Sequence, residues 1–340
     1  MTRNITGLDA TFGSGIAGAS GVAIHYCNGT GWSPSDRKFS IVCQDHGERL
    51  LDANGSWVVE NGVEVPAARH IEYDDASNTI RTVRQSRVGS HAYNHNCANT
   101  LNGDKYLYWN SNVYRSRNSG PYEKIATTPD NLTQIIAASL TFWSSTLTGG
   151  GNAGALLVSE GNSGSIHILN LATMTWTTLR GMTPGRVGIY HNVAAYSEKK
   201  NVMVYGGGGG GNAPTAARTN GAVYPDNRKL WRLNADGSKT AMPDAPHHVG
   251  IFSGMNLQSD RSSGNFLLLG FGELWELNPD GAGTWTQQTG TRAPPAALLQ
   301  PGVPNGFCSV DCSTYGVVLY FDALRGRAPK SRAWAYKHAA

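Results

Sequence analysis

The sequence is poor in charge and has no long apolar run. Only 15% of its 340 residues are charged, and the formal net charge is +4. The lysines and arginines are scattered rather than gathered into the basic stripe that a nucleic-acid groove requires, so we expect no nucleic-acid partner. No window of about 18 apolar residues exists, so we expect no membrane-spanning helix.

Cysteine is also scarce. The five cysteines are Cys27, Cys43, Cys97, Cys308 and Cys312. An odd number without close pairs argues against a disulfide framework, and no C-x-x-C spacing suggests a zinc site. We interpret them as buried reduced thiols, which suits a reducing compartment. We expect neither a metal nor another cofactor.

The first residues lack a secretion signal. Residues 1–7 contain nothing like the apolar core of a signal peptide. This favours a protein of the cytoplasm, or of a virion released by lysis. A chain whose signal had been removed would look the same, and that protein would be extracellular.

What the sequence does contain is a repeated short apolar strand in a composition rich in turns, with 42 glycines, 9 tryptophans and 14 tyrosines. The strand starts are separated by roughly 47 to 67 residues, close to the period of four-stranded propeller blades, which run about 40–50 residues before insertions. The six copies are residues 39–43, 106–109, 155–158, 202–205, 266–269 and 317–321.

The spacing predicts an all-β fold, a β-propeller of four-stranded blades that occupies residues 1–340 as a single domain. We count six blades, or seven if residues 60–90 form a degenerate one. We otherwise expect residues 60–90 to be an insertion, with an extra hairpin at 69–73 and 79–85. A second insertion is expected at 206–226, where a glycine run interrupts blade four.

The last blade is predicted to lack one strand. Its third strand lies at residues 331–338, and the chain then ends. Closing a propeller removes open sheet edges, and a strand from the other terminus commonly completes the last blade. We therefore predict that residues 5–13, with a possible strand at 8–12, close the ring as an N-terminal strand.

Short motifs at the strand ends resemble those of kelch-type, galactose-oxidase-like propellers. Two third strands read Leu-Trp-x-Leu-Asn, at residues 230–234 and 274–278, and one second strand ends in Val204-Tyr205-Gly206-Gly207. Trp176-Thr177-Thr178-Leu179 resembles a fourth strand of that family. The resemblance implies the fold rather than an activity. Other blades depart from it, because Trp109-Asn110, Ser159-Glu160 and Phe321-Asp322 replace the paired glycines.

Histidine and asparagine recur where inner strands begin, at one mouth of the predicted channel. His95-Asn96 and His191-Asn192 directly precede two such strands. In a uronate lyase, a neutral His or Tyr removes the C5 proton while Arg or Asn neutralises the carboxylate. In kind, these residues resemble the sites of propeller-fold ulvan and oligogalacturonate lyases. The candidate catalytic residues are His95, His191, Tyr190, Tyr93 and Arg186.

A glycan subsite could surround them. We expect Trp32 and Trp143 to be exposed and to stack on sugars. The remaining candidate binding residues are His91, Asn96, Asn192, His247 and His248. The recurrence of His-Asn in two blades also has a structural explanation, because repeats share scaffolding: such a pair can hydrogen-bond the backbone of a neighbouring blade.

Two functions therefore compete. The first is a non-enzymatic structural or interaction propeller, oligomeric, binding neighbouring protein subunits or a surface glycan. The low charge and the abundance of Gly, Asn, Thr and Ser resemble bacteriophage tail proteins of the hub or nozzle kind, so a virion component is the favoured form, with the insertions as contact elements. The second is a propeller-fold polysaccharide lyase that acts on uronate polymers by β-elimination.

Overall fold

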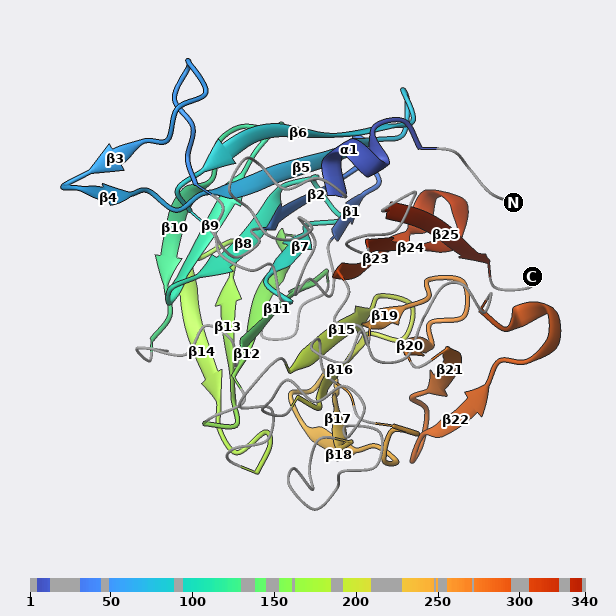
Figure 1. Cartoon of the computed structure of the whole chain (residues 1–340). Helices are drawn as coiled ribbons and strands as arrows, with labels where there is room; N and C mark the ends of the chain where they lie inside the picture. Colours follow the sequence, from blue (N-terminus) through green and yellow to red (C-terminus); the bar gives the residue numbers. More distant parts are fainter. Residues whose placement is uncertain are drawn as a thin grey trace.

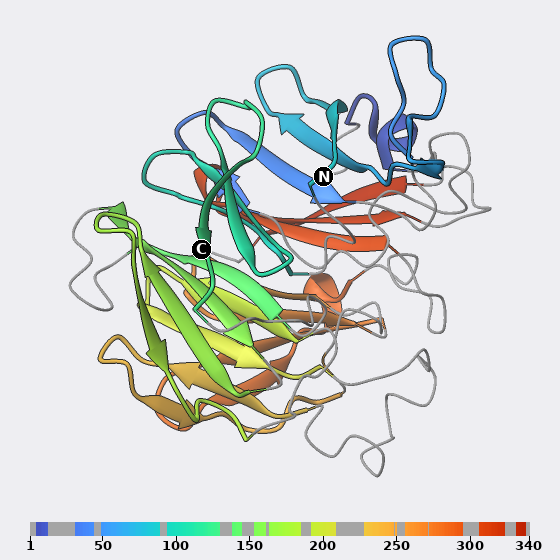
Figure 2. The same ribbon diagram turned by 90° about the vertical axis from the view of Figure 1, so that its left-hand side faces the viewer.

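Six antiparallel sheets stand radially around a central channel (Figures 1 and 2). The computed structural model describes residues 5–12, 31–43, 49–88, 94–129, 138–144, 153–160, 163–184, 192–208, 228–247, 249, 256–270, 272–294, 306–323 and 331–337. Within them lie one short α-helix, α1 (Leu8–Phe12), and two three-residue 3₁₀ turns, beside strands and other turns. No described helix is long and apolar enough to cross a membrane.

Each of the first three blades is a four-stranded sheet in the described residues. Blade one contains β1 (Gly31–Ser33), β2 (Lys38–Cys43), β5 (Ala68–Asp74) and β6 (Thr79–Ser86). Blade two contains β7 (Asn96–Ala98), β8 (Lys105–Trp109), β9 (Asn112–Ser116) and β10 (Glu123–Thr127). Blade three contains β11 (Ala138–Trp143), β12 (Ala155–Glu160), β13 (Ser165–Asn170) and β14 (Thr175–Leu179).

The other three blades complete the ring. Blade four contains β15 (Val193–Ser197), β16 (Val202–Gly206), β17 (Leu230–Leu233) and β18 (Lys239–Ala241). Blade five contains β19 (Asn256–Ser259), β20 (Phe266–Gly270), β21 (Glu273–Asn278) and β22 (Thr284–Gln287). Blade six contains β23 (Gly306–Cys312), β24 (Val317–Ala323) and β25 (Ser331–Lys337), three strands in the described part of the chain.

The six repeated apolar strands are the second strands of the six blades, as the sequence predicts: β2, β8, β12, β16, β20 and β24. They are rich in consecutive apolar residues because a neighbouring blade covers each face. All six residues of β12 are buried, and so are all five of β20. The prediction of six four-stranded blades is thereby confirmed, with blade six the exception in its described residues.

Each seam between neighbouring blades contains a separate apolar cluster. One cluster, for example, joins blades two and three through Tyr108 and Val158. Another joins blades five and six through Leu267, Leu269 and Tyr320. The innermost strands also touch in a circle, from β1 to β7, β11, β15, β19 and β23, and β23 touches β1 again.

The ring closes by side-chain packing between blades six and one. Phe39 of blade one stands 5.2 Å from Phe321 of blade six, centroid to centroid. Cys308 and Val310 of β23 belong to the same buried cluster as Ile41 of β2. No N-terminal strand takes part in this seam among the described residues.

The predicted N-terminal strand is wrong in its structure and in its partner. Residues 8–12 form the helix α1, and Thr6 forms a parallel bridge with Thr79 of β6 in blade one. Gly7 has a positive φ of 82°, which ends the extended segment, and the Thr11 amide then donates to the Gly7 carbonyl over 2.9 Å. The buried Arg69 donates to the Thr11 carbonyl over 2.8 Å, so blade one holds the helix. The helix also lies beside β25.

The expected insertion at residues 60–90 is also misplaced. The segments predicted as an extra hairpin are β5 and β6, the third and fourth strands of blade one. What is inserted instead is a smaller hairpin, β3 (Val59–Glu60) and β4 (Val63–Glu64), between β2 and β5. Most of the second predicted insertion, residues 209–226, lies outside the described residues.

The described cysteines are thiols. Cys43, Cys308 and Cys312 are buried and Cys97 is half-buried, and no disulfide joins them. Cys27 lies outside the described residues.

A histidine without a hydrogen-bond partner is buried at the seam between blades one and two. His70 of β5 is fully buried, and neither ring nitrogen has a partner among the described residues. Its ring meets that of Tyr122 edge-on at 5.3 Å. Burial, with a smaller contribution from the nearby Arg84, lowers the pKa of His70 from 6.5 to about 4.

We predict that His70 makes the fold acid-sensitive. Because its pKa is lower in the folded state, the unfolded chain binds the proton first, so stability is lost as the pH falls from about 6.5 to 4. The loss should approach ~3 kcal/mol. In His70→Phe, which keeps a ring against Tyr122, urea unfolding between pH 7 and 4.5 should show a smaller loss. Equal losses in the two proteins would contradict the assignment.

Candidate functional site

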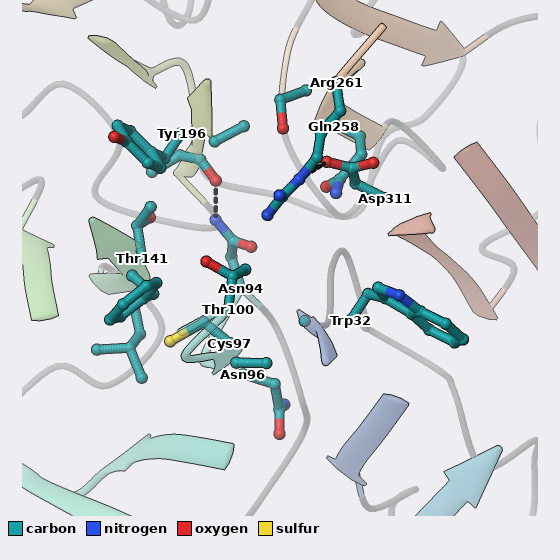
Figure 3. Close-up of a pocket in the computed structure, with 17 residues that line it drawn as sticks. Trp32, Asn94, Asn96, Cys97, Thr100, Thr141, Tyr196, Gln258, Arg261 and Asp311 are labelled. Carbon is teal, nitrogen blue, oxygen red and sulfur yellow. Dashed lines mark hydrogen bonds and ion pairs between the residues drawn. The ribbon is translucent and has the colours of Figure 1, made fainter. Parts of the chain in front are cut away.

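A small polar cavity lies in the central channel, and all six blades line it (Figure 3). Its volume is about 90 Å³. This is room for a few water molecules, at roughly 30 Å³ each, and falls short of the roughly 300–1,000 Å³ of typical ligand pockets. The polar lining includes Asn94, Thr141, Tyr196, Gln258, Arg261 and Asp311.

The two asparagines of the His-Asn pairs each donate a hydrogen bond to the backbone of the preceding blade. Asn96, which begins β7, accepts from the Val42 amide over 2.9 Å and donates to the Val42 carbonyl over 3.2 Å. Asn192, just before β15, donates to the Ser159 carbonyl over 3.2 Å. Val42 and Ser159 are each the penultimate residue of the second strand in the preceding blade. Both asparagines therefore tie one blade to another.

Other described residues at the same end of the inner strands are equally enclosed. Asn94 donates to the Ala194 carbonyl over 3.0 Å, across the channel from blade two to blade four (Figure 3). His95 is 1% exposed and meets the Tyr108 ring edge-on at 5.6 Å. His247 is also 1% exposed. The described members of the candidate site are thus buried side chains.

The remaining candidates fall outside the described residues. They are Tyr93, Arg186, Tyr190 and His191 among the proposed catalytic residues, and His91 and His248 among the proposed binding residues.

The two tryptophans expected to be exposed are buried, so that prediction is wrong. Trp143 is 0% exposed and stacks on Tyr196 at 4.7 Å. Trp32 is 3% exposed, and its indole donates to Thr314 Oγ1 over 3.0 Å. Both belong to inner strands, whose side chains neighbouring blades cover, and sequence alone did not distinguish them from loop tryptophans.

At the other end of the inner strands, an arginine joins three blades. Arg261, just after β19, donates through Nε to Asp311 of β23 over 2.9 Å. Its Nη1 also pairs with Glu198, just after β15, at 2.5 Å. The guanidinium points into the cavity (Figure 3). Burial raises the pKa of Asp311 to about 7, against the opposing pull of Arg261.

A much larger apolar groove lies between blades six and one. Its volume is about 630 Å³, within the range of ligand-binding sites. Blade six contributes the face of β25 that carries Ala333 and Ala335. The other lining residues are Ile5, Trp32, Tyr73, Asp75, Cys312, Tyr315, Val317, Leu319, Trp334 and Lys337. We call this the closure groove.

The closure groove runs beside an open sheet edge. β25 pairs with β24 along all seven residues, and no described strand pairs with its other edge. At the rim, Asp75 accepts hydrogen bonds from Arg37 and from the Tyr315 hydroxyl, and the Arg37 guanidinium lies over the Tyr315 ring. Tyr315 remains 41% exposed. An apolar wall beside free strand edges can accept an extended polypeptide segment.

Sequence reasoning missed both the Arg261 cluster and the closure groove. The three cluster residues come from three blades, and no motif links them. The three strands predicted for blade six could have indicated the groove, because a blade with three strands leaves one sheet edge open. From the sequence, an N-terminal strand is instead predicted to fill this edge.

The described residues contain no group of three or more His, Cys, Asp or Glu side chains arranged to hold a metal ion.

Comparisons with known proteins reveal only distant similarity. No protein-family model matches the chain, and no curated protein sequence matches it. Among solved structures, virginiamycin B lyase from Staphylococcus aureus is similar at 10% identity and a TM-score of 0.48, covering 96% of this chain and 98% of that one.

Two other solved structures are similar at the same level. Regucalcin, a calcium-binding protein from Agrobacterium tumefaciens, shows 11% identity and a TM-score of 0.46, with 91% and 87% of the two chains covered. The GH93 α-L-arabinofuranosidase of Fusarium graminearum shows 11% identity and a TM-score of 0.46, with 89% and 90% covered. Likeness at this level carries no argument about function.

We predict that the Asn96 side chain stabilises the ring. Asn96→Ala leaves the amide and carbonyl of the fully buried Val42 without these partners, which should cost about 2–3 kcal/mol in urea unfolding. Asn54→Ala, in an exposed turn, is the control and should change stability by less than about 0.5 kcal/mol. Equal effects of the two substitutions would show that the bonds to Val42 do not hold the blades together.

Proposed function

We propose that this chain is a non-enzymatic propeller that binds other protein subunits as a component of an assembly. The closure groove is the observation that carries the proposal. It is the larger by far of the two cavities described above, about 630 Å³ against about 90 Å³ in the channel, and its lining is mainly apolar and aromatic. Such a surface, beside a β25 edge with which no described strand pairs, suits a polypeptide better than a hydrophilic polymer.

The polar groups of the channel support the same proposal. Asn94, Asn96 and Asn192 hydrogen-bond the protein itself. A catalytic or glycan-binding asparagine must present its amide to a ligand, and the side-chain NH₂ groups of these three asparagines instead donate to backbone carbonyls of other blades. The channel thus serves as the polar centre of a scaffold, and binding is left to the outer surface.

We further propose that the assembly is a virion, such as a bacteriophage tail, built on kelch-like repeats. This finer proposal is supported by composition and by short motifs: 15% charged residues, 42 glycines, and the Val204-Tyr205-Gly206-Gly207 strand end. Surface glycan would be a further ligand of such a tail protein. The polysaccharide lyase alternative draws no support from the described residues, in which His95 and His247 are buried.

The absence of lyase activity can be tested directly. Incubation with a panel of uronate polymers should yield no rise in the ultraviolet absorbance of the unsaturated product. A rise that His191→Ala abolishes would establish the lyase and overturn the non-enzymatic part of the proposal.

We predict that the closure groove binds extended peptides. Peptides selected from a random library for binding to the whole protein should lose at least tenfold in affinity to Ala335→Arg, whose side chain would fill the groove. The matched control is Ala241→Arg, another exposed alanine on an outermost strand, β18, and it should leave affinity unchanged. Peptides that bind both variants equally, or a library that yields no binder, would overturn the proposal.

A further inference from the structure

A rigid hairpin arm projects from blade one. β3 and β4 pair through Val59–Glu64 and Glu60–Val63, and the tip residues Asn61 and Gly62 both have positive φ, 52° and 77°. Asn-Gly with this geometry forms the tight two-residue turn that suits a twisted hairpin. We call residues 49–66 the arm. It stands clear of the ring in Figure 1.

Backbone pairing holds the stem of the arm. The Leu50 amide donates to the Val65 carbonyl over 2.8 Å, and the Val58 amide donates to the Leu50 carbonyl over 2.9 Å. The Val65 amide donates to Val58 over 2.9 Å. The arm is therefore ordered before it meets any partner, which lowers the entropy cost of binding.

The arm exposes apolar side chains that the ring does not cover. Trp57 is 44% exposed, Val59 57% and Val63 67%, and these are half of the six large apolar residues found exposed in the described chain. Trp57 and Val59 are two residues apart and so share a face, and Glu64 lies opposite Val59 on that face. Val63 lies opposite Glu60, on the other face of the hairpin. An ordered arm with exposed apolar side chains indicates a docking element.

The closure groove has the complementary features. Its walls are apolar, and no strand in the described part of the chain pairs with the outer edge of β25. Lys337 lines the groove, and no carboxylate among the described residues forms an ion pair with it. Glu64 of the arm is paired with Arg49, but both side chains are about a third exposed, so that pair is weak and can be exchanged. A face of Trp57, Val59 and Glu64 therefore matches an apolar groove with a lysine.

The arm cannot reach the groove of its own molecule. It leads into the first residue of β5, whereas Asp75 of the groove directly follows the last residue of β5. A seven-residue strand spans about 20 Å, so the two features lie at opposite ends of blade one. Figure 1 shows the arm at the left and β25 at the right. A contact between them must join two molecules.

We propose that the arm of one molecule docks in the closure groove of a second copy of the same chain. Trp57 and Val59 enter the apolar groove beside the edge of β25, and Glu64 pairs with Lys337. The contact uses different surfaces on the two partners, so it repeats head to tail and builds a ring or a filament. This inference rests on the proposed function and names the partner for the groove.

The test is complementation between two variants, followed by sedimentation velocity over a range of concentrations. The arm variant is Trp57→Ser with Val59→Thr, and the groove variant is Ala335→Arg. The wild-type chain should form species larger than dimers. Each variant alone should be monomeric, with self-association weakened at least tenfold. Mixed together, they should form a dimer that grows no further, because each supplies the one surface that the other lacks.

Matched controls exclude non-specific effects. Met174→Ser removes another exposed apolar side chain, and Ala241→Arg adds the same charge to another outer strand, so both should associate like the wild type. A wild-type chain that stays monomeric, or a mixture that gives no dimer, would overturn the docking. If such a chain still binds selected peptides in the closure groove, only the identity of the partner fails. If it binds none, the proposed function fails as well.

A charge exchange tests the pairing of Glu64 with Lys337. Glu64→Lys and Lys337→Glu should each weaken association, and an equimolar mixture of the two variants should recover part of the lost affinity. Mixtures no better than the single variants would show that this pair takes no part in the contact.

Discussion

Large apolar side chains packed between neighbouring blades hold this protein together, and the seam between blades six and one makes the packing continuous. At that seam the ring centroid of Phe39 lies 5.4 Å from that of Tyr73 and 5.2 Å from that of Phe321, and all three side chains are buried. Each fully buried side chain of this size contributes up to about 3 kcal/mol. Without this seam the six sheets would form an open arc with apolar faces exposed at both ends. The helix α1 and the closure groove both exist beside it.

The second strands could be predicted because their burial on both faces produces continuous apolar runs, a signal that each strand carries alone. The helical structure of residues 8–12 could not be predicted in this way. The run is short enough for a strand or a helix, and contacts with Arg69 and Ile80, far away in sequence, accompany the helix. The third and fourth strands of blade one were misassigned because the arm separates them from the second, which breaks the spacing on which the repeat was recognised.

The site was predictable to a similar, limited extent. Asparagines that recur at inner-strand starts are a local signal, and two of them donate hydrogen bonds to the backbone of the preceding blade. The Arg261 cluster brings together side chains from three blades, 50 or more residues apart in sequence, so only the closed ring reveals it. Trp32 and Trp143 were predicted to be exposed but are buried. Residue type alone does not show which face of an inner strand a neighbouring blade covers, so the sequence could not reveal their burial.

The molecule has a small polar cavity at its centre and apolar surfaces at its periphery. The channel cavity is small, and Asn94, Asn96 and Asn192 donate hydrogen bonds within the protein. The arm and the closure groove instead present apolar surface at opposite ends of blade one. Among the described residues, no strand pairs with the outer edge of β25, and this edge lies beside the apolar closure groove. The proposed binding of a polypeptide would use this seam between blades six and one.

Amide hydrogen exchange of β25 tests the central claim, that side-chain packing closes the ring and leaves this strand as an edge. The measurement should be made by NMR at a concentration where the protein is monomeric. In an antiparallel edge strand, alternate amides face the neighbouring strand and the others face outward. The account predicts slow exchange at the residues bonded to β24 and fast exchange at those between them. Slow exchange at every residue of β25 would show that another strand completes blade six, and would contradict the account.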